Sequence, residues 1–262
     1  MTLKWHLGTM GFGYKQWIGP FYPAGMNARS FLSYYGQHFD AVEIDSTFYG
    51  TPRAEQLQKW ANSTPKQFKF CLKTPRQITH EQPLPISIDE MLVFLERVQL
   101  LKDKLGAILI QFGPDFTVQY QEELDHFLSQ LPKTIRYAVE FRHRSWAVEE
   151  TAVLLQKHNA CFVSADYIHL PKEIVQTTDF LYCRFIGPHG QYATKDKELV
   201  DLTPALNQWH QKMTPYFDKV SNIFGFFNND FSGHSPTTCN RFRKIVGLSE
   251  QEIRPLQQGR LF

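Results

Sequence analysis

The chain has 262 residues, of which 42% are hydrophobic and 21% are charged, and its formal net charge is +2. This composition excludes a globally disordered chain, because it supplies enough apolar surface for a core. The small net charge excludes nucleic-acid binding through overall charge alone, so a basic binding patch would have to be local.

The eight strand-like segments of the chain are short runs rich in β-branched and aromatic residues. They cover residues 5–8, 41–44, 68–72, 107–112, 137–141, 161–164, 180–185 and 223–227. Most are separated by segments with helical periodicity, the pattern of consecutive βα units. Eight such units and this chain length predict an α/β fold, a single (β/α)₈ TIM barrel, over residues 1–250.

One predicted helix has boundary signals at its start and an apolar face. Ser87 and Glu90 have the spacing of a capping box, and Met91, Leu95 and Val98 mark one apolar face. Further helix starts are predicted where an N-cap residue precedes proline, at Thr51-Pro52, Thr203-Pro204 and Ser235-Pro236. Residues 166–179 are too short and irregular for a full helix, so we expect a loop between the sixth and seventh strands.

Cellular location and redox state follow from what the sequence lacks. No apolar run approaches the roughly 18 residues of a membrane span. Residues 1–6 also lack the basic-then-apolar layout of a signal peptide. We expect a cytoplasmic protein without a membrane partner. The cysteines are widely spaced and should be reduced core residues, namely Cys71, Cys161, Cys183 and Cys239.

In a TIM barrel the residues at the C-terminal ends of the strands face the ligand. The polar residues at these positions are Thr9, Tyr14, Glu43, Asp45, Lys73, Gln111, Glu140, Arg142, His143, Asp166, Arg184, Asn228 and Asn229. Strand alternation places Glu43 and Asp45 on one face. A buried carboxylate needs a partner, so Glu43 is expected to meet Lys73 or Arg142. The alternative is a salt-bridged plug that closes the barrel mouth.

A cationic segment follows the fifth strand. Arg142, His143 and Arg144 come directly before Ser145, a predicted N-cap, and a helix N-terminus also favours anions. Aromatic residues in the neighbouring loops offer flat surfaces for stacking, and these are Tyr14, Trp17, Phe21, Tyr22, Phe48, Tyr49 and Trp146. The combination predicts an anionic small molecule or a nucleic acid as the ligand.

No known cofactor motif is present. Residues 8–13 are glycine-rich but do not fit GxGxxG, and they predict a flexible loop at the mouth. A divalent metal could be held only if distant side chains converged, namely Glu43, Glu140, His143, Asp166 and His189. No spacing motif supports such a site, so we predict no cofactor and assign no metal ligands.

The chain resembles the YecE-like family, known as domain of unknown function seventy-two, nearly from end to end. The segments that carry the resemblance are Gly8-Thr9 with Tyr14 and Trp17, Phe21-Tyr22-Pro23, Val42-Glu43-Ile44, Ser46-Thr47-Phe48-Tyr49, Lys73, Thr79-His80-Glu81, Gln111-Phe112, Val139-Glu140-Phe141-Arg142-His143, Ser145-Trp146, Arg184, Phe227-Asn228-Asn229-Asp230 and Gly233-His234. The resemblance implies a barrel but no reaction, because fold alone does not determine function.

This chain departs from the family pattern at four positions. The family usually has serine, tryptophan and serine where this chain has Met10, Phe12 and Gly13. It usually has asparagine where this chain has Asp45, which adds negative charge to the mouth.

Residues 251–262 form a predicted tail. Gln258, Leu261 and Phe262 are spaced as in the short peptides by which bacterial proteins bind the DNA sliding clamp, where an apolar Leu-Phe pair enters a preformed pocket. The clamp is therefore a candidate partner. The alternative is that Leu261 and Phe262 pack back onto the barrel.

The leading hypothesis is an enzyme, a hydrolase acting on a phosphorylated ligand such as a nucleotide or nucleic acid. Its catalytic residues would be Glu43, Lys73, Glu140 and His143. Its substrate-binding residues would be Tyr14, Trp17, Phe48, Tyr49, Gln111, Arg142, Trp146, Arg184, Asn228 and Asn229. The alternatives are a non-catalytic module that binds nucleic acid or anions, and a carbohydrate hydrolase with Glu43 and Glu140 as paired acids.

Overall fold

Nine parallel strands form the sheet of the computed structural model, which describes residues 2–249. They are β1 (Lys4–Met10), β2 (Ala41–Ile44), β3 (Lys69–Lys73), β4 (Leu105–Gln111), β5 (Tyr137–Glu140), β6 (Ala160–Phe162), β7 (Ser164–Asp166), β8 (Phe180–Phe185) and β9 (Asn222–Phe227). All eight predicted runs are strands, and the sixth is divided at Val163 into β6 and β7. The first strand extends to Met10, so the loop predicted for residues 8–13 begins only at Gly11.

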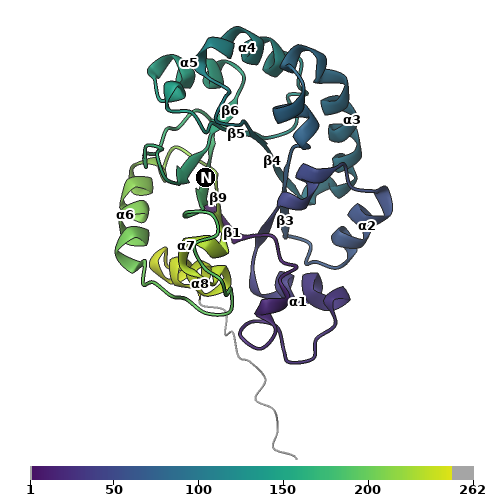
Figure 1. Cartoon of the computed structure of the whole chain (residues 1–262), viewed down its shortest axis with the longest axis vertical. Helices are drawn as coiled ribbons and strands as arrows, with labels where there is room; N and C mark the ends of the chain where they lie inside the picture. Colours follow the sequence, from purple (N-terminus) through teal and green to yellow (C-terminus); the bar gives the residue numbers. More distant parts are fainter. Residues whose placement is uncertain (1, 250–262) are drawn as a thin grey trace, which may run out of the picture.

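The division at Val163 explains how the sheet closes. In the order β6-β5-β4-β3-β2-β1-β9-β8-β7, the two halves of the sixth run lie at opposite ends. β6 pairs with β5, and β7 pairs with β8. Only Val163 separates the halves in the chain, so the sheet curls into a nearly closed barrel (Figure 1). This confirms the predicted TIM barrel.

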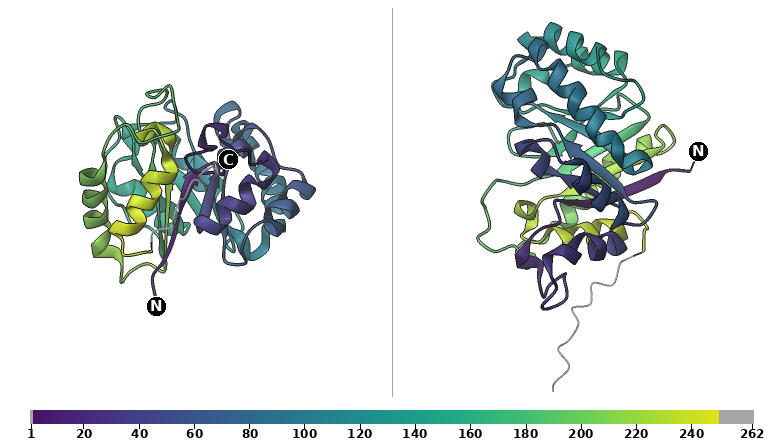
Figure 2. Two further views of the ribbon diagram at one scale, coloured as in Figure 1. Left: turned by 90° about the horizontal axis from the view of Figure 1, so that it is seen from below. Right: turned by 90° about the vertical axis from the view of Figure 1, so that its right-hand side faces the viewer.

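Helices surround the barrel on its outside (Figures 1 and 2). They are α1 (Phe31–His38), α2 (Ala54–Asn62), α3 (Ile88–Val98), α4 (Gln121–Ser129), α5 (Glu149–Lys157), α6 (Thr203–Met213), α7 (Asn229–Ser232) and α8 (Ser235–Ile245). No helix lies between β7 and β8, which confirms the predicted irregular connection. Within residues 2–249, no helix combines the length and hydropathy needed to cross a membrane.

The predicted helix starts are close to the observed ones, but the capping differs. Ser87 precedes α3 as predicted, yet its Oγ donates to the carbonyl oxygen of Pro83 at 3.1 Å, so the predicted capping box does not form. α2 begins at Ala54, two residues after the expected proline. α6 and α8 begin at Thr203 and Ser235 themselves, one residue before their prolines.

Two apolar cores fill the molecule. One lies between the strands and the outer helices, and its largest fully buried side chains include Trp17, Tyr35 and Trp146. The other fills the barrel interior with residues such as Leu109, Tyr182 and Phe224. All four cysteines are buried and outside any disulfide, as predicted. Because the barrel interior is filled with side chains, a ligand cannot pass through its centre.

Gly8 marks a very close approach between β1 and β2. A Cβ atom at Gly8 would lie 1.8 Å from the carbonyl oxygen of Ala41, its backbone neighbour in the strand ladder. We expect Gly8→Ala to lower the free energy of unfolding by about 1–3 kcal/mol, measured by urea denaturation. Gly13→Ala is the matched control, because nothing lies within 4 Å of a Cβ there. Equal losses in the two variants would contradict the steric explanation.

Candidate functional site

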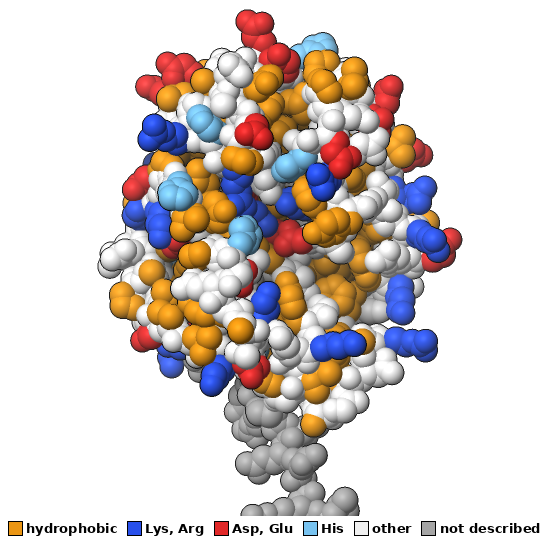
Figure 3. All heavy atoms as spheres, in the orientation of Figure 1, with side chains coloured by type: hydrophobic (Ala, Val, Ile, Leu, Met, Phe, Trp, Pro, Cys, Tyr) orange, Lys and Arg blue, Asp and Glu red, His pale blue; other side chains and the backbone are white. Residues whose placement is uncertain are grey.

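The mouth of the barrel is the end at which the strands finish. Its strand-end residues are Met10, Ile44, Lys73, Gln111, Glu140, Asp166, Phe185 and Phe227. Figure 3 looks onto this end, and acidic and basic side chains lie side by side at its centre with histidines around them. Opposite charges therefore meet where the fold predicts a ligand site.

One guanidinium group organises the floor of the mouth. Arg184 Nε donates to both carboxylate oxygens of Glu43, at 3.0 and 3.1 Å, and its Nη2 lies 2.7 Å from Glu43 Oε1. Arg184 Nη1 donates to Glu140 Oε2 at 2.6 Å. Tyr182 completes the group by donating its hydroxyl to Glu43 Oε2 at 2.6 Å. We call these four residues the Arg184 cluster, and all of them are buried.

The expected partners of Glu43 were wrong. Glu43 binds Arg184 rather than Lys73 or Arg142. Arg142 instead forms an ion pair with Glu140, with 2.5 Å between Nε and Oε1, in a direction that does not suit a hydrogen bond. The Arg142 guanidinium also stacks on Tyr167, 4.1 Å from the ring centroid. Strand alternation indicated the face of Glu43 correctly but not its partner on another strand.

The two buried carboxylates have opposite pKa shifts. Burial raises the pKa of Glu43, the charge of Arg184 opposes this rise and the charge of Asp45 adds to it, and together they bring the pKa to about 7. Burial would also raise the pKa of Glu140, but the charges of Arg184, Arg142 and Lys73 outweigh it and lower that pKa. Glu43 is therefore the carboxyl group of the pair that exchanges a proton near neutral pH.

Three side chains around the floor are accessible from solvent. Lys73 is half-buried, and its ammonium lies 3.9 Å from the centroid of the Phe48 ring. Burial and then the charge of Arg184 lower the pKa of Lys73. The Asp45 side chain is 39% exposed, with Oδ1 3.4 Å from Arg184 Nη2. His80 is exposed and packs against Phe48 at a ring distance of 5.1 Å.

Within residues 2–249, no carboxylate oxygen lies within 4.0 Å of Lys73 Nζ. The pKa of His80 is lowered by burial and then by the charge of Lys73, so its imidazole is held in the neutral form. Asp45 was among the polar strand-end residues expected to face the ligand, whereas His80 was not assigned to the site from sequence. His80 lies in the Thr79-His80-Glu81 segment that resembles the YecE-like family, and this resemblance was the signal for it.

Several predicted substrate-binding aromatics do not present a face to the mouth. Trp17 is fully buried, and its Nε1 donates to Asn229 Oδ1 at 3.1 Å. Trp146 is also fully buried. Tyr14 is half-buried and donates its hydroxyl to the Met10 carbonyl oxygen at 2.9 Å. Tyr49 is 85% exposed and contacts Phe48, so these two remain accessible aromatics beside Lys73.

The predicted polar ligand contacts of the mouth are partly engaged in local structure. Gln111 is buried and donates from Nε2 to the Phe112 carbonyl oxygen at 2.6 Å. Asn228 caps α7 by accepting from the backbone N–H of Asp230 at 2.9 Å. Asn229 is buried, and its Oδ1 accepts from the backbone N–H of Ser235 at 3.1 Å. These contacts hold the segment that follows β9.

In the described part of the chain, His143 forms no hydrogen bond or ion pair with the Arg184 cluster. Its Nδ1 accepts from the backbone N–H of Ser145, so His143 caps the short 3-10 helix Arg144–Trp146. The predicted N-cap role of Ser145 was wrong, because the next helix, α5, begins at Glu149. Ser145 lies inside the short 3-10 helix Arg144–Trp146, which separates β5 from α5, so it cannot cap α5.

The residues considered for a metal site do not converge. Among the described residues, no group of three or more His, Cys, Asp and Glu side chains could hold a metal ion. Asp166 accepts a hydrogen bond from Trp209 Nε1 at 2.8 Å and forms an ion pair with Lys172 at 2.5 Å.

The predicted partner-binding residues, Gln258, Leu261 and Phe262, lie outside the described residues.

Several known proteins that are similar to this chain share one family description. The family model "Protein of unknown function DUF72" matches residues 6–260. The chain is 29% identical over 211 residues to the UPF0759 protein YecE of Escherichia coli, which covers 71% of this chain and 77% of YecE. It is 24% identical over 290 residues to the UPF0759 protein YunF of Bacillus subtilis, which covers 96% of this chain and 98% of YunF.

Solved structures agree with this grouping. A DUF72 family protein from Thermotoga maritima superposes with a TM-score of 0.75 at 26% identity, covering 93% of this chain and 99% of that one. A DUF72 family protein from Enterococcus faecalis has the same fold, with a TM-score of 0.74 at 22% identity and coverage of 97% and 100%. The chain therefore belongs to the YecE-like DUF72 family of proteins of unknown function.

Proposed function

We propose that the mouth binds a phosphorylated ligand, such as a nucleotide or nucleic acid, and that the protein is an enzyme acting on it. Lys73 carries this proposal. Its ammonium is half-buried at the end of β3, and within residues 2–249 no carboxylate oxygen lies within 4.0 Å of it. A partly desolvated cation with no carboxylate in direct contact is stabilised by an anion, and phosphate oxygens accept charge-assisted hydrogen bonds from ammonium groups.

The Arg184 cluster would support binding by adjusting the charge of the floor. Glu43 and Glu140 are both fully buried, so a ligand above the floor would not touch them directly. The pKa of about 7 makes Glu43 neutral in part of the population near neutral pH. A neutral Glu43 leaves the floor with one negative charge fewer, which favours an anion beside Lys73.

The accessible groups suit hydrolysis of a phosphate ester. Asp45 or His80 would take the proton of an attacking water as the new P–O bond forms. The bond to the ester oxygen would then break, and the same group would give that proton to the departing oxygen, which leaves as an alcohol. Lys73 would stabilise the negative charge that develops on the phosphate oxygens. In this assignment Glu43 and Glu140 do not touch the substrate but hold the guanidinium groups of Arg184 and Arg142 in place.

The burial of Glu43 and Glu140 also bears on the two alternative functions, a carbohydrate hydrolase and a non-catalytic binding module. A carbohydrate hydrolase needs two carboxyl groups facing an open groove. Glu43 and Glu140 are instead buried and bound to one guanidinium, which favours a phosphorylated ligand over a glycoside. A non-catalytic binding module would use the same contacts, and the burial of both glutamates suits it. Turnover separates this alternative from an enzyme.

We expect Lys73→Ala to weaken the binding of pyrophosphate by about tenfold, because one charge-assisted contact is lost. Isothermal titration calorimetry would measure the affinity. Lys66→Ala is the matched control, because the exposed Lys66 precedes β3 and Lys73 ends it, at the opposite end of the same strand.

Equal affinities of Lys73→Ala and Lys66→Ala would refute the proposed phosphate site. Screening phosphatase and nuclease substrates with the wild type and Lys73→Ala would then test catalysis. Binding that depends on Lys73, without turnover of any substrate, would identify a binding module.

A further inference from the structure

The barrel wall parts at the mouth between β5 and β7. The ladder between β5 and β6 ends at the pair of Val139 and Phe162, followed by a hydrogen bond from Val163 N–H to the Val139 carbonyl oxygen at 2.9 Å. Beyond Val163 the chain pairs with β8 instead, from Ser164 onward. Within the described residues no ladder joins β5 to β7. Residues 167–179, which follow β7, form no helix, and α5 borders the parting through Ala152.

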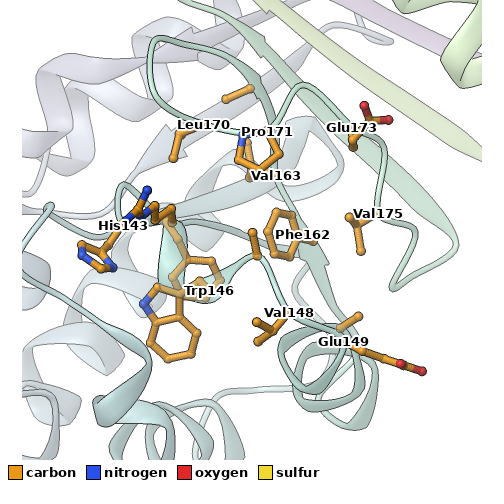
Figure 4. A pocket seen from close by; sticks show the side chains of 15 residues that line it. His143, Trp146, Val148, Glu149, Phe162, Val163, Leu170, Pro171, Glu173 and Val175 are labelled. Atoms are coloured by element: carbon orange, nitrogen blue, oxygen red, sulfur yellow. The ribbon is translucent and has the colours of Figure 1, made fainter.

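A cavity of about 350 Å³ occupies this parting. Phe141 and Trp146 line it from the β5 side, and Val163, Ala165 and Leu170 line it from the other side. Figure 4 shows Trp146, Val163 and Leu170 around the space between the loop after β5 and the irregular segment after β7. The volume lies within the roughly 300–1,000 Å³ of small-molecule sites, and the lining is mostly apolar as in such sites.

The rim of the cavity carries positive charge on the side of the mouth. Arg144 lines it and is exposed, and within residues 2–249 no carboxylate oxygen lies within 4.0 Å of its guanidinium. The Nδ1 of His143 accepts a hydrogen bond from the Ser145 N–H. The neutral ring therefore carries its proton on Nε2, which can donate a hydrogen bond to a ligand. Glu149 and Glu173 also line the cavity, on the side away from His143, with their carboxylates directed outward (Figure 4).

Arg142 links the cavity to the mouth along the chain. This residue lies between Phe141 and His143, which both line the cavity, while its own guanidinium contacts Glu140 and Tyr167 at the mouth. The positive charge of Arg142 therefore lies on the chain segment that connects the apolar cavity with the floor of the mouth. A ligand with one anionic end and one apolar end would match this order.

We propose that the ligand of the mouth carries an apolar ring that enters the cavity between β5 and β7, with its phosphate directed toward Arg142 and Lys73. The substrate class is a phosphate ester of an aromatic or other hydrocarbon ring. A sugar or another hydroxyl-rich group would leave hydroxyls without partners against Phe141, Val163 and Leu170. The phosphate half of this proposal rests on the proposed function, and the ring half rests on the cavity.

Two phosphonates that cannot be hydrolysed at the P–C bond would test it, namely methylphosphonate and 2-naphthylmethylphosphonate. We expect the naphthyl compound to bind at least about tenfold more tightly, because its ring is removed from water. We also expect it to shift the indole N–H signal of Trp146 in ¹H–¹⁵N NMR spectra. That signal is identified with Trp146→Phe and compared with the signal of Trp5.

Ala152→Phe would fill the cavity from α5 and should abolish the advantage of the naphthyl compound while leaving methylphosphonate binding unchanged. Val153→Phe is the matched control, because Val153 is its neighbour on α5, is 59% exposed and does not line the cavity. Lys73→Ala should weaken both phosphonates by the same factor. Thermal unfolding would verify that the variants are folded, and the Trp146 signal tests the wild type independently of them.

The outcomes separate this proposal from the proposed function. Equal affinities for both phosphonates, with dependence on Lys73, would overturn the ring site and leave the phosphate site standing. Loss of Lys73 dependence for both compounds would overturn the phosphate site. A Trp146 shift with binding that ignores Lys73 would show that the cavity does not belong to the ligand of the mouth, which overturns the joint assignment.

Discussion

Arg184→Met should lower the free energy of unfolding at pH 7 by about 3–5 kcal/mol, the cost of breaking a buried ion pair by removing one partner. Arg184 is 4% exposed and is bound to two carboxylates that are fully buried. Methionine has a similar length but no charge, so Glu43 and Glu140 would keep their burial and lose their main counter-ion. Urea denaturation would measure the loss, and Arg29→Met, at an exposed arginine, is the control.

The loss of charge at position 184, unlike the change of side-chain volume, should be partly reversible by removing the two partner charges. Adding Glu43→Gln and Glu140→Gln to Arg184→Met should recover part of the lost stability, because the uncompensated charges are then removed. Arg142 would lose its own partner, so recovery should be incomplete. A triple variant that is less stable than Arg184→Met, or a single variant as stable as Arg29→Met, would contradict the electrostatic account.

The stability of the wild type relative to Glu43→Gln should fall as the pH rises from about 5 to 8. The folded-state pKa of Glu43 is about 7, above its ordinary value of 4.5, so the folded state holds this proton more tightly than the unfolded state. The resulting stability is fully present below the ordinary pKa and is lost as the pH rises through the folded-state pKa. The shift corresponds to a change of about 3 kcal/mol.

Urea denaturation of both proteins at several pH values would measure this difference, since glutamine keeps the shape of the side chain but does not titrate. The lowered pKa of Glu140 acts in the opposite direction. Its contribution is present above the ordinary pKa of a glutamate and is lost as the pH falls through the folded-state pKa, so it lies below the measured window. A difference that stays constant from pH 5 to 8 would show that Glu43 does not titrate there.

The fold was predictable because each strand run carries its own local signal. The eight runs were identified from β-branched and aromatic residues, and each became a strand. Helix starts were predicted to within two residues, but the capping box at Ser87 failed because the Pro83 carbonyl oxygen competes for its hydroxyl. Side-chain hydrogen bonds of this kind depend on a local turn that the spacing of residues does not specify.

The candidate site was predictable in place but not in its contacts. Alternation along the strand put Glu43 and Asp45 on one face, and Arg184 contacts both. The partner of Glu43 comes from β8, 141 residues away in the chain, and sequence spacing carries no information about that distance across the barrel. Trp17 shows the same limit, since its burial against Asn229 depends on packing between distant segments.

The sequence by itself determined the barrel, the end at which a site can form and the residue types gathered there, because strand period and strand order are local properties. Only the tertiary structure decided that Arg184 joins Glu43 to Glu140, that no carboxylate oxygen of the described residues lies within 4.0 Å of Lys73 Nζ, and that the ladder is interrupted beside Val163. These features depend on the register and closure of the sheet, which are set by packing between strands far apart in the chain.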